Sequence, residues 1–426
     1  MNTRQPIFAQ VMETIHPQQF ARCVTHYGGE YKMQSFSCWD QFLCMGFGQL
    51  TYRESLRDTV DCLCARQDLL YHLGFRGAIR RSTLADANEN RDWRIYATLA
   101  QQLIRRARRL YADEPLATEL DATVYALDST TIDLCLSVFP WARFRRTKAA
   151  IKLHTLLDLR GPIPTFVYIS DGKLHDVNAL DEIPIEPGSF YVMDRGYLDF
   201  ARLYVLHQQG GFFVIRAKNP LCYNRLHSLP VNVATGVRSD QIITLTVFYS
   251  RQGYPERLRR VRFFDAETDR FFVYLTNNFA LPALTIALLY KSRWQVELFF
   301  KWIKQHLRIK SFFGTSDNAV KTQVWIAICV YVLVAILKKQ LNLPGSLHKI
   351  LQILSVNAFE KVSIQELLTQ TMPRFQDDEN RNQWMSFDLQ PGTHDRMYLM
   401  KRNQAFTATL EPMEGARGSL THVCPA

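Results

Sequence analysis

The feature that most limits the fold of this chain is a run of short β-type and helical segments between residues 122 and 218. The β-type segments are rich in apolar, β-branched and aromatic residues and are bounded by turn residues, as strands are. Three strands come first, and then a helix, a strand, a helix and a strand follow in that order. The predicted strands cover residues 123–134, 150–161, 164–172, 189–197 and 212–218, and the predicted helices cover 176–183 and 200–210.

This order of elements fits an α/β fold with a ribonuclease-H-like mixed sheet, and different segments flank it on both sides. Hairpin-like runs at 241–250, 259–267 and 270–278 predict a β-rich insertion. A helical pattern runs from Pro282 to Ile309, and a second runs from Ala319 to Leu341. The expected organisation is a helical N-terminal DNA-binding domain over 1–120, the first part of the sheet domain over 121–219, the insertion over 220–278, the second part of the sheet domain over 279–345, and a C-terminal helical region and tail over 346–426.

Charge, cysteine content and hydropathy narrow the class of protein. With 51 basic and 40 acidic residues the formal charge is +11, an excess that often accompanies a polyanionic partner. Nine scattered cysteines without paired CxxC motifs indicate reduced thiols in a cytoplasmic protein and no zinc site. The longest apolar run, 324–337, is shorter than the ~20 residues that span a bilayer, so we expect a buried helix and no membrane partner.

Two aspartates occupy similar positions in the predicted sheet. Asp128 lies within the apolar strand VYALDSTTI, and Asp194 ends the strand FYVM, with Gly196 permitting a tight turn after it. A buried carboxylate without a partner is costly, so we expect a positive group beside Asp128. Two such aspartates and a glutamate would suit two-metal phosphodiester chemistry, because Mg²⁺ prefers hard carboxylate oxygens.

A glutamate that could complete the set is Glu297, in the segment LLYKSRWQVELFFKWIKQHL. On a continuous helix, at ~100° per residue, one face would hold it together with basic and aromatic neighbours. Singly, each acid also has an ordinary interpretation: Asp128 as a strand-end residue, Asp194 as a partner of Arg195, and Glu297 as half of a surface ion pair. The residues expected on this face are Tyr290, Arg293, Glu297, Lys301 and Lys304.

Together the motifs ALDSTTIDL, YVMDRGY and Tyr-x2-Arg-x3-Glu-x6-Lys resemble the DDE transposases of bacterial insertion sequences, specifically insertion sequence family four. The resemblance implies that Asp128, Asp194 and Glu297 bind catalytic magnesium as two ions, with Mn²⁺ as a substitute. It also implies that Tyr290, Arg293 and Lys304 contact the DNA backbone near the transposon end. One departure is that no tryptophan occurs between Trp141 and Trp294, where some relatives stack one on a flipped base; Phe248, Tyr249 or Tyr254 are the candidate replacements.

Further basic residues are candidate DNA contacts. Arg195 and Tyr197 either position the substrate or brace Asp194, and His154 is more often a satisfied sheet residue than a ligand. Two basic stretches are expected to follow DNA. They comprise Arg143, Arg145, Arg146, Lys148 and Lys152 in the sheet domain and Arg257, Arg259, Arg260 and Arg262 in the insertion.

The resemblance implies an enzyme that binds the terminal repeats of its element, cleaves them and joins the freed 3' hydroxyl to target DNA, through a hairpin if it cuts and pastes. Two ends must be paired, so a homodimer on double-stranded DNA is expected, in the bacterial cytoplasm and at the nucleoid. Three alternatives stay open at this point: a host nuclease or resolvase on the same fold, a catalytically inactive regulator derived from a transposase, and an unrelated α/β enzyme.

Overall fold

The structure is a computed structural model that describes residues 5–31, 33–116, 120–306, 312–343 and 345–371. Contacts divide the chain after Met372, and all the described residues belong to the compact unit that precedes this point. The described residues end at 371, so the predicted tail lies outside them. The five-part division along the sequence stays a prediction, because the described parts pack as one unit.

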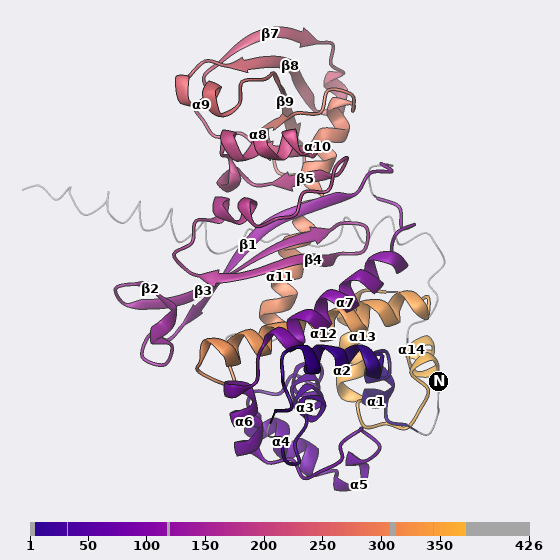
Figure 1. Cartoon of the computed structure of the whole chain (residues 1–426). Coiled ribbons are helices and arrows are strands. Elements are labelled where there is room, and N and C mark those ends of the chain that lie inside the picture. The colour runs from indigo at the N-terminus through magenta and orange to yellow at the C-terminus, as the bar shows by residue number, and fades with distance from the viewer. Residues whose placement is uncertain (1–4, 32, 117–119, 307–311, 344, 372–426) are drawn as a thin grey trace, which may run out of the picture. The chain divides into compact units, whose positions relative to one another are not determined.

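A ten-stranded mixed sheet forms the centre of the fold (Figure 1). Its central strand β1 is antiparallel to β3 and parallel to β5, and β5 is parallel to β6. With β4 beside β3, the order β4-β3-β1-β5-β6 confirms the predicted ribonuclease-H-like sheet. The bounds are β1 Val124–Leu134, β2 Arg143–Arg145, β3 Lys148–Asp158, β4 Ile163–Asp171, β5 Phe190–Met193 and β6 Phe212–Arg216.

The predicted insertion extends this same sheet. Its last strand, β10, pairs antiparallel with β6, and β9, β8 and β7 follow in order toward the edge. The end of the run predicted as a strand at 241–250 is instead the short helix α9. The bounds are β7 Tyr223–Leu229, β8 Val237–Leu245, α9 Phe248–Gly253, β9 Leu258–Asp265 and β10 Arg270–Thr276.

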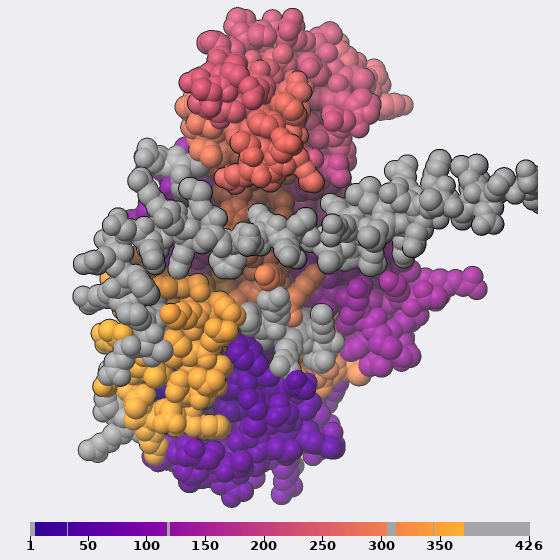
Figure 2. Space-filling model, turned by 180° about the vertical axis from the view of Figure 1, so that it is seen from behind, coloured from indigo at the N-terminus to yellow at the C-terminus, as the bar shows by residue number. Residues whose placement is uncertain are grey.

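A helical layer is assembled from both ends of the described chain around α12 (Asp317–Gln340). Figures 1 and 2 show the N-terminal and C-terminal helices side by side, and the backbone N–H of Ile7 donates to the carbonyl of Glu360 at 2.9 Å. The other members are α1 Ile7–Met12, α2 Pro17–His26, α3 Cys38–Leu50, α4 Leu56–Cys64, α5 Gln67–Leu70, α6 Arg81–Asn90, α7 Arg94–Leu110, α13 Leu347–Val356 and α14 Ile364–Thr371.

Helix α12 is the one described helix long and apolar enough to cross a membrane, yet 94% of its apolar window is buried within the protein. It packs against α7, α3 and α6. Buried apolar surface of this extent is the main favourable contribution to folding. The prediction that residues 324–337 form a buried helix is confirmed.

Alternation along β1 divides the core into two clusters, one on each face of the sheet. Ala126 and Ile132 belong to the cluster beneath the helical layer, and Tyr125 and Leu127 belong to the smaller cluster on the other face. The smaller cluster is covered by α8 (Phe200–Gln208) and by two short 3-10 helices. These are η2 (Asp176–Asp181), which the sequence predicted as an ordinary helix, and η3 (Arg195–Tyr197). The remaining short turns are η1 Pro140–Ala142 and η4 Val233–Thr235.

Candidate active site

The parallel pairing of β1 with β5 brings the two predicted aspartates together. Leu127 is the register partner of Met193, so Asp128 and Asp194 are the next residues on adjacent strands. Asp128 lies on the helical-layer face of β1, the face of Ala126, because side chains alternate along a strand. Helix α11 (Trp294–His306), which begins with the turn that contains Glu297, packs against β1.

A single guanidinium joins two of the three acids. Arg293 Nη1 donates to Asp128 Oδ2 at 2.6 Å, and Arg293 Nη2 donates to Glu297 Oε1 at 2.5 Å. The side chains of Arg293 and Asp128 are 15% and 21% exposed, whereas that of Glu297 is 58% exposed. The positive group expected beside a buried Asp128 is therefore Arg293, which lies 165 positions away in the sequence.

The third acid has a different partner from the same motif. The hydroxyl of Tyr290 donates to Asp194 Oδ1 at 3.0 Å, and its ring packs on that of Tyr274 with centroids 4.6 Å apart. Burial, reinforced by the charge of Asp194, raises the pKa of Tyr290 to about 12. Tyr290 is thus a neutral donor at physiological pH, and it orients a carboxylate at the end of β5.

The helix that was predicted to hold this motif is interrupted. Helix α10 (Ala283–Lys291) ends before Ser292, α11 begins at Trp294, and residues 292 and 293 form a turn between them. The prediction of one continuous helix was wrong at this point, so the shared helical face does not explain the arrangement. The turn places Arg293 between two helices, where its side chain reaches both Asp128 and the next helix.

Asp128 is held in an environment that disfavours its charge. The pKa of this carboxyl is raised to about 6, mainly by burial and to a smaller extent by Glu297 and Asp194, while Arg293 and the backbone N–H of Ser129 act in the opposite direction. Clustered carboxylates in a partly dry site are typical of functional centres, because the shared repulsion is relieved when a cation binds.

The donor set fits a divalent cation. Three carboxylates from two adjacent strands and one helix offer hard oxygen ligands, and the side chain of Glu297 is exposed enough to turn. Among the described residues, no three acid, histidine or cysteine side chains form a preassembled metal cluster. Arg293 supplies positive charge between Asp128 and Glu297 in this arrangement, so an ion bound there would take over that role.

The pKa of Asp128 predicts a competition between protons and metal. Because a carboxylate must be deprotonated to bind a metal, we expect Mn²⁺ affinity to fall about tenfold per pH unit below pH 6 and to level off above it. Electron paramagnetic resonance titrations of free Mn²⁺ between pH 5 and 8 measure this dependence. Asp128→Asn should remove it, and an affinity that does not change over this range in the native chain would contradict the assignment of Asp128 as a ligand.

A polar network lies behind Asp128 on the other face of β1. Ser129 Oγ donates to Asp176 Oδ1 at 2.7 Å, and Lys152 Nζ donates to the same oxygen at 3.1 Å and to the carbonyl of Leu174 at 2.7 Å. The side chain of Lys152 is thus engaged within the protein, which favours a structural role over the DNA contact expected for it. The sequence analysis did not identify Ser129 or Asp176 as residues of the site. The signal that could have indicated Asp176 is its position as an acid at the start of the helical segment that follows β4.

His154 is a buried sheet residue, as expected, although only one of its two ring nitrogens has a hydrogen-bond partner among the described residues. It is fully buried in β3, its Nε2 lies 2.9 Å from Ser170 Oγ, and burial lowers its pKa to about 4. A histidine that stays neutral and hydrogen-bonded here does not titrate near pH 7.

The remaining predicted DNA contacts differ in accessibility. Tyr197 is 2% exposed in the smaller core cluster, which favours bracing of the site over a direct contact. Lys304 is half-buried in α11. The predicted contacts that are exposed are Arg146, Lys148, Arg195 and Lys301.

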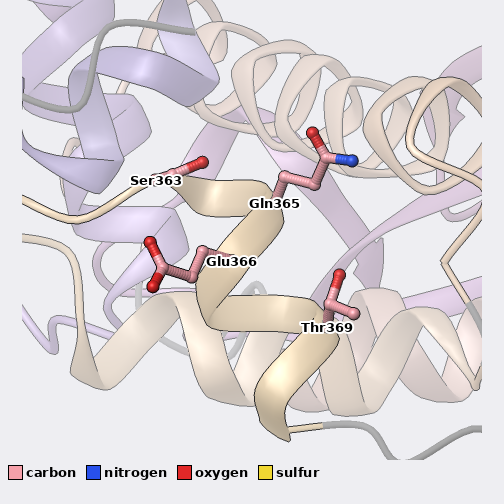
Figure 3. A pocket seen from close by; sticks show the side chains of 4 residues that line it. All are labelled: Ser363, Gln365, Glu366 and Thr369. Carbon is pink, nitrogen blue, oxygen red and sulfur yellow. The ribbon is translucent and has the colours of Figure 1, made fainter.

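A pocket of about 350 Å³ lies elsewhere, on α14, where Ser363, Gln365, Glu366 and Thr369 line it (Figure 3). None of these residues belongs to the three elements that hold the acids, so this pocket is not part of the candidate active site.

Comparison with known proteins decides the family. Residues 119–333 match the model of the transposase DDE domain, which spans β1, β5 and Glu297. The chain belongs to the DDE transposase family. As a member of this family it is a DNA-cleaving and strand-transferring enzyme, and the family in general depends on divalent metal. Residues 3–76 match a domain of unknown function (DUF4372), so the predicted DNA-binding role of the N-terminal helices stays a prediction.

Bacterial relatives of this transposase agree with the assignment. A Sinorhizobium fredii protein provisionally named transposase y4zB is 35% identical over 59% of this chain and 70% of its own length. A Geobacillus stearothermophilus protein, named as the transposase for insertion sequence element IS5377, is 33% identical over 52% of this chain and 59% of its own length. A solved piggyBac transposase synaptic complex with hairpin DNA aligns at 9% identity with a TM-score of 0.43, over 96% of this chain and 91% of that chain.

Proposed function

We propose that this transposase uses Asp128, Asp194 and Glu297 to bind two Mg²⁺ ions, with Mn²⁺ as a substitute, and cleaves the ends of its own insertion sequence. The observation that supports this most directly is the double contact of Arg293 with Asp128 and Glu297, because it joins acids from a strand and a helix at one place. The hydroxyl of Tyr290 links the third acid to the same motif.

The residues of the site have different proposed roles in phosphodiester hydrolysis. When bound, the metal supplies an activated water and stabilises charge on the phosphate. The pairing of β1 with β5 fixes Asp128 and Asp194 on adjacent strands. Tyr290 donates a hydrogen bond to Asp194, and Arg293 donates one to Asp128. The proposed DNA contacts near these acids are Tyr290, Arg293, Lys301, Lys304 and Arg195, and Arg146 and Lys148 are proposed contacts farther out along the sheet. For Lys152 and Tyr197 the structure favours supporting roles.

Cleavage at the terminal repeats leaves a 3' hydroxyl, which we propose attacks the opposite strand to form a hairpin and, after reopening, joins target DNA. Two ends have to be held together during these steps, so we propose a homodimer on double-stranded DNA. We propose that the reaction takes place in the bacterial cytoplasm, on DNA of the nucleoid.

A strand-transfer assay tests this proposal. A labelled duplex carrying the terminal repeat, taken from the DNA that flanks the coding sequence, is incubated with the full chain, Mg²⁺ and a supercoiled target plasmid. We expect joined products from a pre-cut end and a hairpin-sized band from an uncut end on denaturing gels. Cutting without joining would support a nuclease role, and binding without cutting would support a regulator.

The exposed aromatic residues of α9 are candidates to replace the tryptophan that some relatives stack on a flipped base. Phe248 is 72% exposed and Tyr249 is 81% exposed, and their rings lie 5.4 Å apart. Tyr254, in contrast, is 1% exposed, and its hydroxyl lies 2.8 Å from His207 Nδ1, so it is not available for stacking on a base. We therefore propose that Phe248 or Tyr249 stacks on an unpaired base near the cleavage site.

Alanine at Phe248 and Tyr249 should weaken the hairpin step. Stacking of a base on an aromatic ring contributes about 1–3 kcal/mol, so we expect hairpin formation to slow roughly 5- to 150-fold while first-strand nicking continues. Quantification of nicked and hairpin species over time measures the effect. Val233→Ala, at another exposed apolar side chain of the same β-rich segment, is the control, and equal hairpin rates in all three proteins would refute the stacking role.

A further inference from the structure

The hairpin formed by β2 and the start of β3 is a cationic arm that nothing in the proposed cleavage chemistry requires. Its exposed basic side chains are Arg143, Arg145, Arg146 and Lys148, and the segment 143–148 contains no acid. No ion pair links these four to an acid among the described residues; Arg145 lies instead over the ring of Phe144 at 5.0 Å. We propose that the cleaved duplex runs along β3 from the active site to this arm, which binds its phosphate backbone about seven base pairs from the cleavage site.

The arm is fixed to the body of the protein at its base. Trp141 Nε1 donates to the carbonyl of Thr315 at 2.7 Å, and Phe139 packs edge-on against Phe312. Phe144 lies over Gly172 so closely that a Cβ added there would be 2.8 Å from its ring. These contacts hold the basic tip in place relative to the strand, as a fixed contact with DNA requires.

The strand register gives the distance between the tip and the active site. Asp128 pairs with Thr155 of β3, and Lys148 is seven residues earlier on that strand. At about 3.4 Å per residue in an antiparallel strand, the tip lies roughly 24 Å from the acid along the sheet. Phosphates on one DNA strand are about 3.4 Å apart along the helix axis, so on a duplex that runs along β3, as proposed, this separation corresponds to about seven base pairs.

Backbone contact is the mode of recognition that this surface fits. The arm offers basic side chains on both faces of a two-stranded ribbon and at its turn, so it can bind phosphates on either side of a groove. Such contacts fix the position of a protein on DNA without reading its sequence. The inference rests on the proposed function, because it places the arm relative to the proposed catalytic acids.

The test combines a triple variant with phosphate mapping. Arg145→Ala, Arg146→Ala and Lys148→Ala are made together in the full chain, and ethylation interference is mapped on the labelled terminal-repeat duplex. We expect loss of the contact about seven base pairs from the cut and persistence of the contacts beside it. The slope of log binding constant against log salt should become shallower by about three, because each lost phosphate contact contributes about 0.9.

A control removes positive charge from the C-terminal part of the helical layer. Lys349 and Lys361 are exposed, and replacing both with alanine should leave the distal contact and the cleavage rate as in the native chain. If the arm variant folds with a native unfolding temperature but keeps the distal contact and the native salt slope, the inference is wrong. If the native chain binds but does not cut, the proposed function fails instead, so the two failures are distinguishable.

Discussion

Replacing Glu297 with glutamine is expected to lower the rate of DNA cleavage about 10³-fold while leaving DNA binding close to native. Metal-assisted stabilisation of the transition state amounts to several kcal/mol, and each 1.36 kcal/mol is a tenfold change in rate. Glutamine keeps the size of the side chain and a carbonyl oxygen that can accept from Arg293, so the fold should persist. Cleavage of the labelled terminal duplex in Mg²⁺, at protein concentrations matched for binding, measures the change.

Glu267→Gln is the matched control for the same chemical change. Glu267 is 68% exposed and pairs with Lys291 at 2.5 Å on the surface, where an ion pair contributes 0–1 kcal/mol at most. Its cleavage rate should equal that of the native chain. If Glu297→Gln also cuts at the native rate, Glu297 is not a metal ligand and the three-acid assignment has to be abandoned.

The largest effect on stability is expected at Arg259, in β9. Its guanidinium donates to both oxygens of Asp240 at 2.9 and 2.7 Å, and both side chains are 4% exposed. It also donates to the carbonyls of Asn278 and Leu281. Arg259→Met leaves a buried carboxylate without its partner, so we expect the free energy of unfolding to fall by about 3–5 kcal/mol.

Urea denaturation followed by circular dichroism measures this loss. Arg262→Met is a control on the same strand, because Arg262 is exposed over the ring of Phe271, and it should change stability by no more than about 0.5 kcal/mol. Combining Arg259→Met with Asp240→Leu should recover much of the loss, since the unpaired charge is gone. A loss below about 1 kcal/mol for Arg259→Met alone would show that the Arg259–Asp240 ion pair does not stabilise the fold.

The result at Arg259 bears on what the sequence can predict. Four arginines of the insertion were expected to follow DNA, yet Arg259 is a buried structural residue, whereas Arg262 is exposed. Their spacing along β9 does not separate the two roles, because Asp240 comes from the neighbouring strand. The central strands, in contrast, were predicted correctly, since alternating apolar runs and turn residues are local properties of the chain.

In the candidate site, too, features that depend on local sequence could be predicted, and features that depend on tertiary packing could not. Asp128 and Asp194 could be found because each lies in or directly after an apolar strand, and strand order then places them on adjacent strands. The break between α10 and α11 could not be predicted, because the sequence around Ser292 contains no proline or glycine and its apolar spacing continues. The contact of Arg293 with Asp128, across 165 positions, depends on tertiary packing that no local pattern encodes.

The position of α12 has a consequence for the synthesis of the protein. Tyr111, at the end of α7, donates to the carbonyl of Ala335, and α1 contacts α12 as well, so the N-terminal helices remain without their main packing partner until the ribosome has passed residue 340. Contacts of such long sequence separation form slowly and leave apolar surface exposed to aggregation in the meantime. Nascent chains released before α12 should therefore be substrates for chaperones and proteases, and nuclease activity should arise only from nearly full-length translation products.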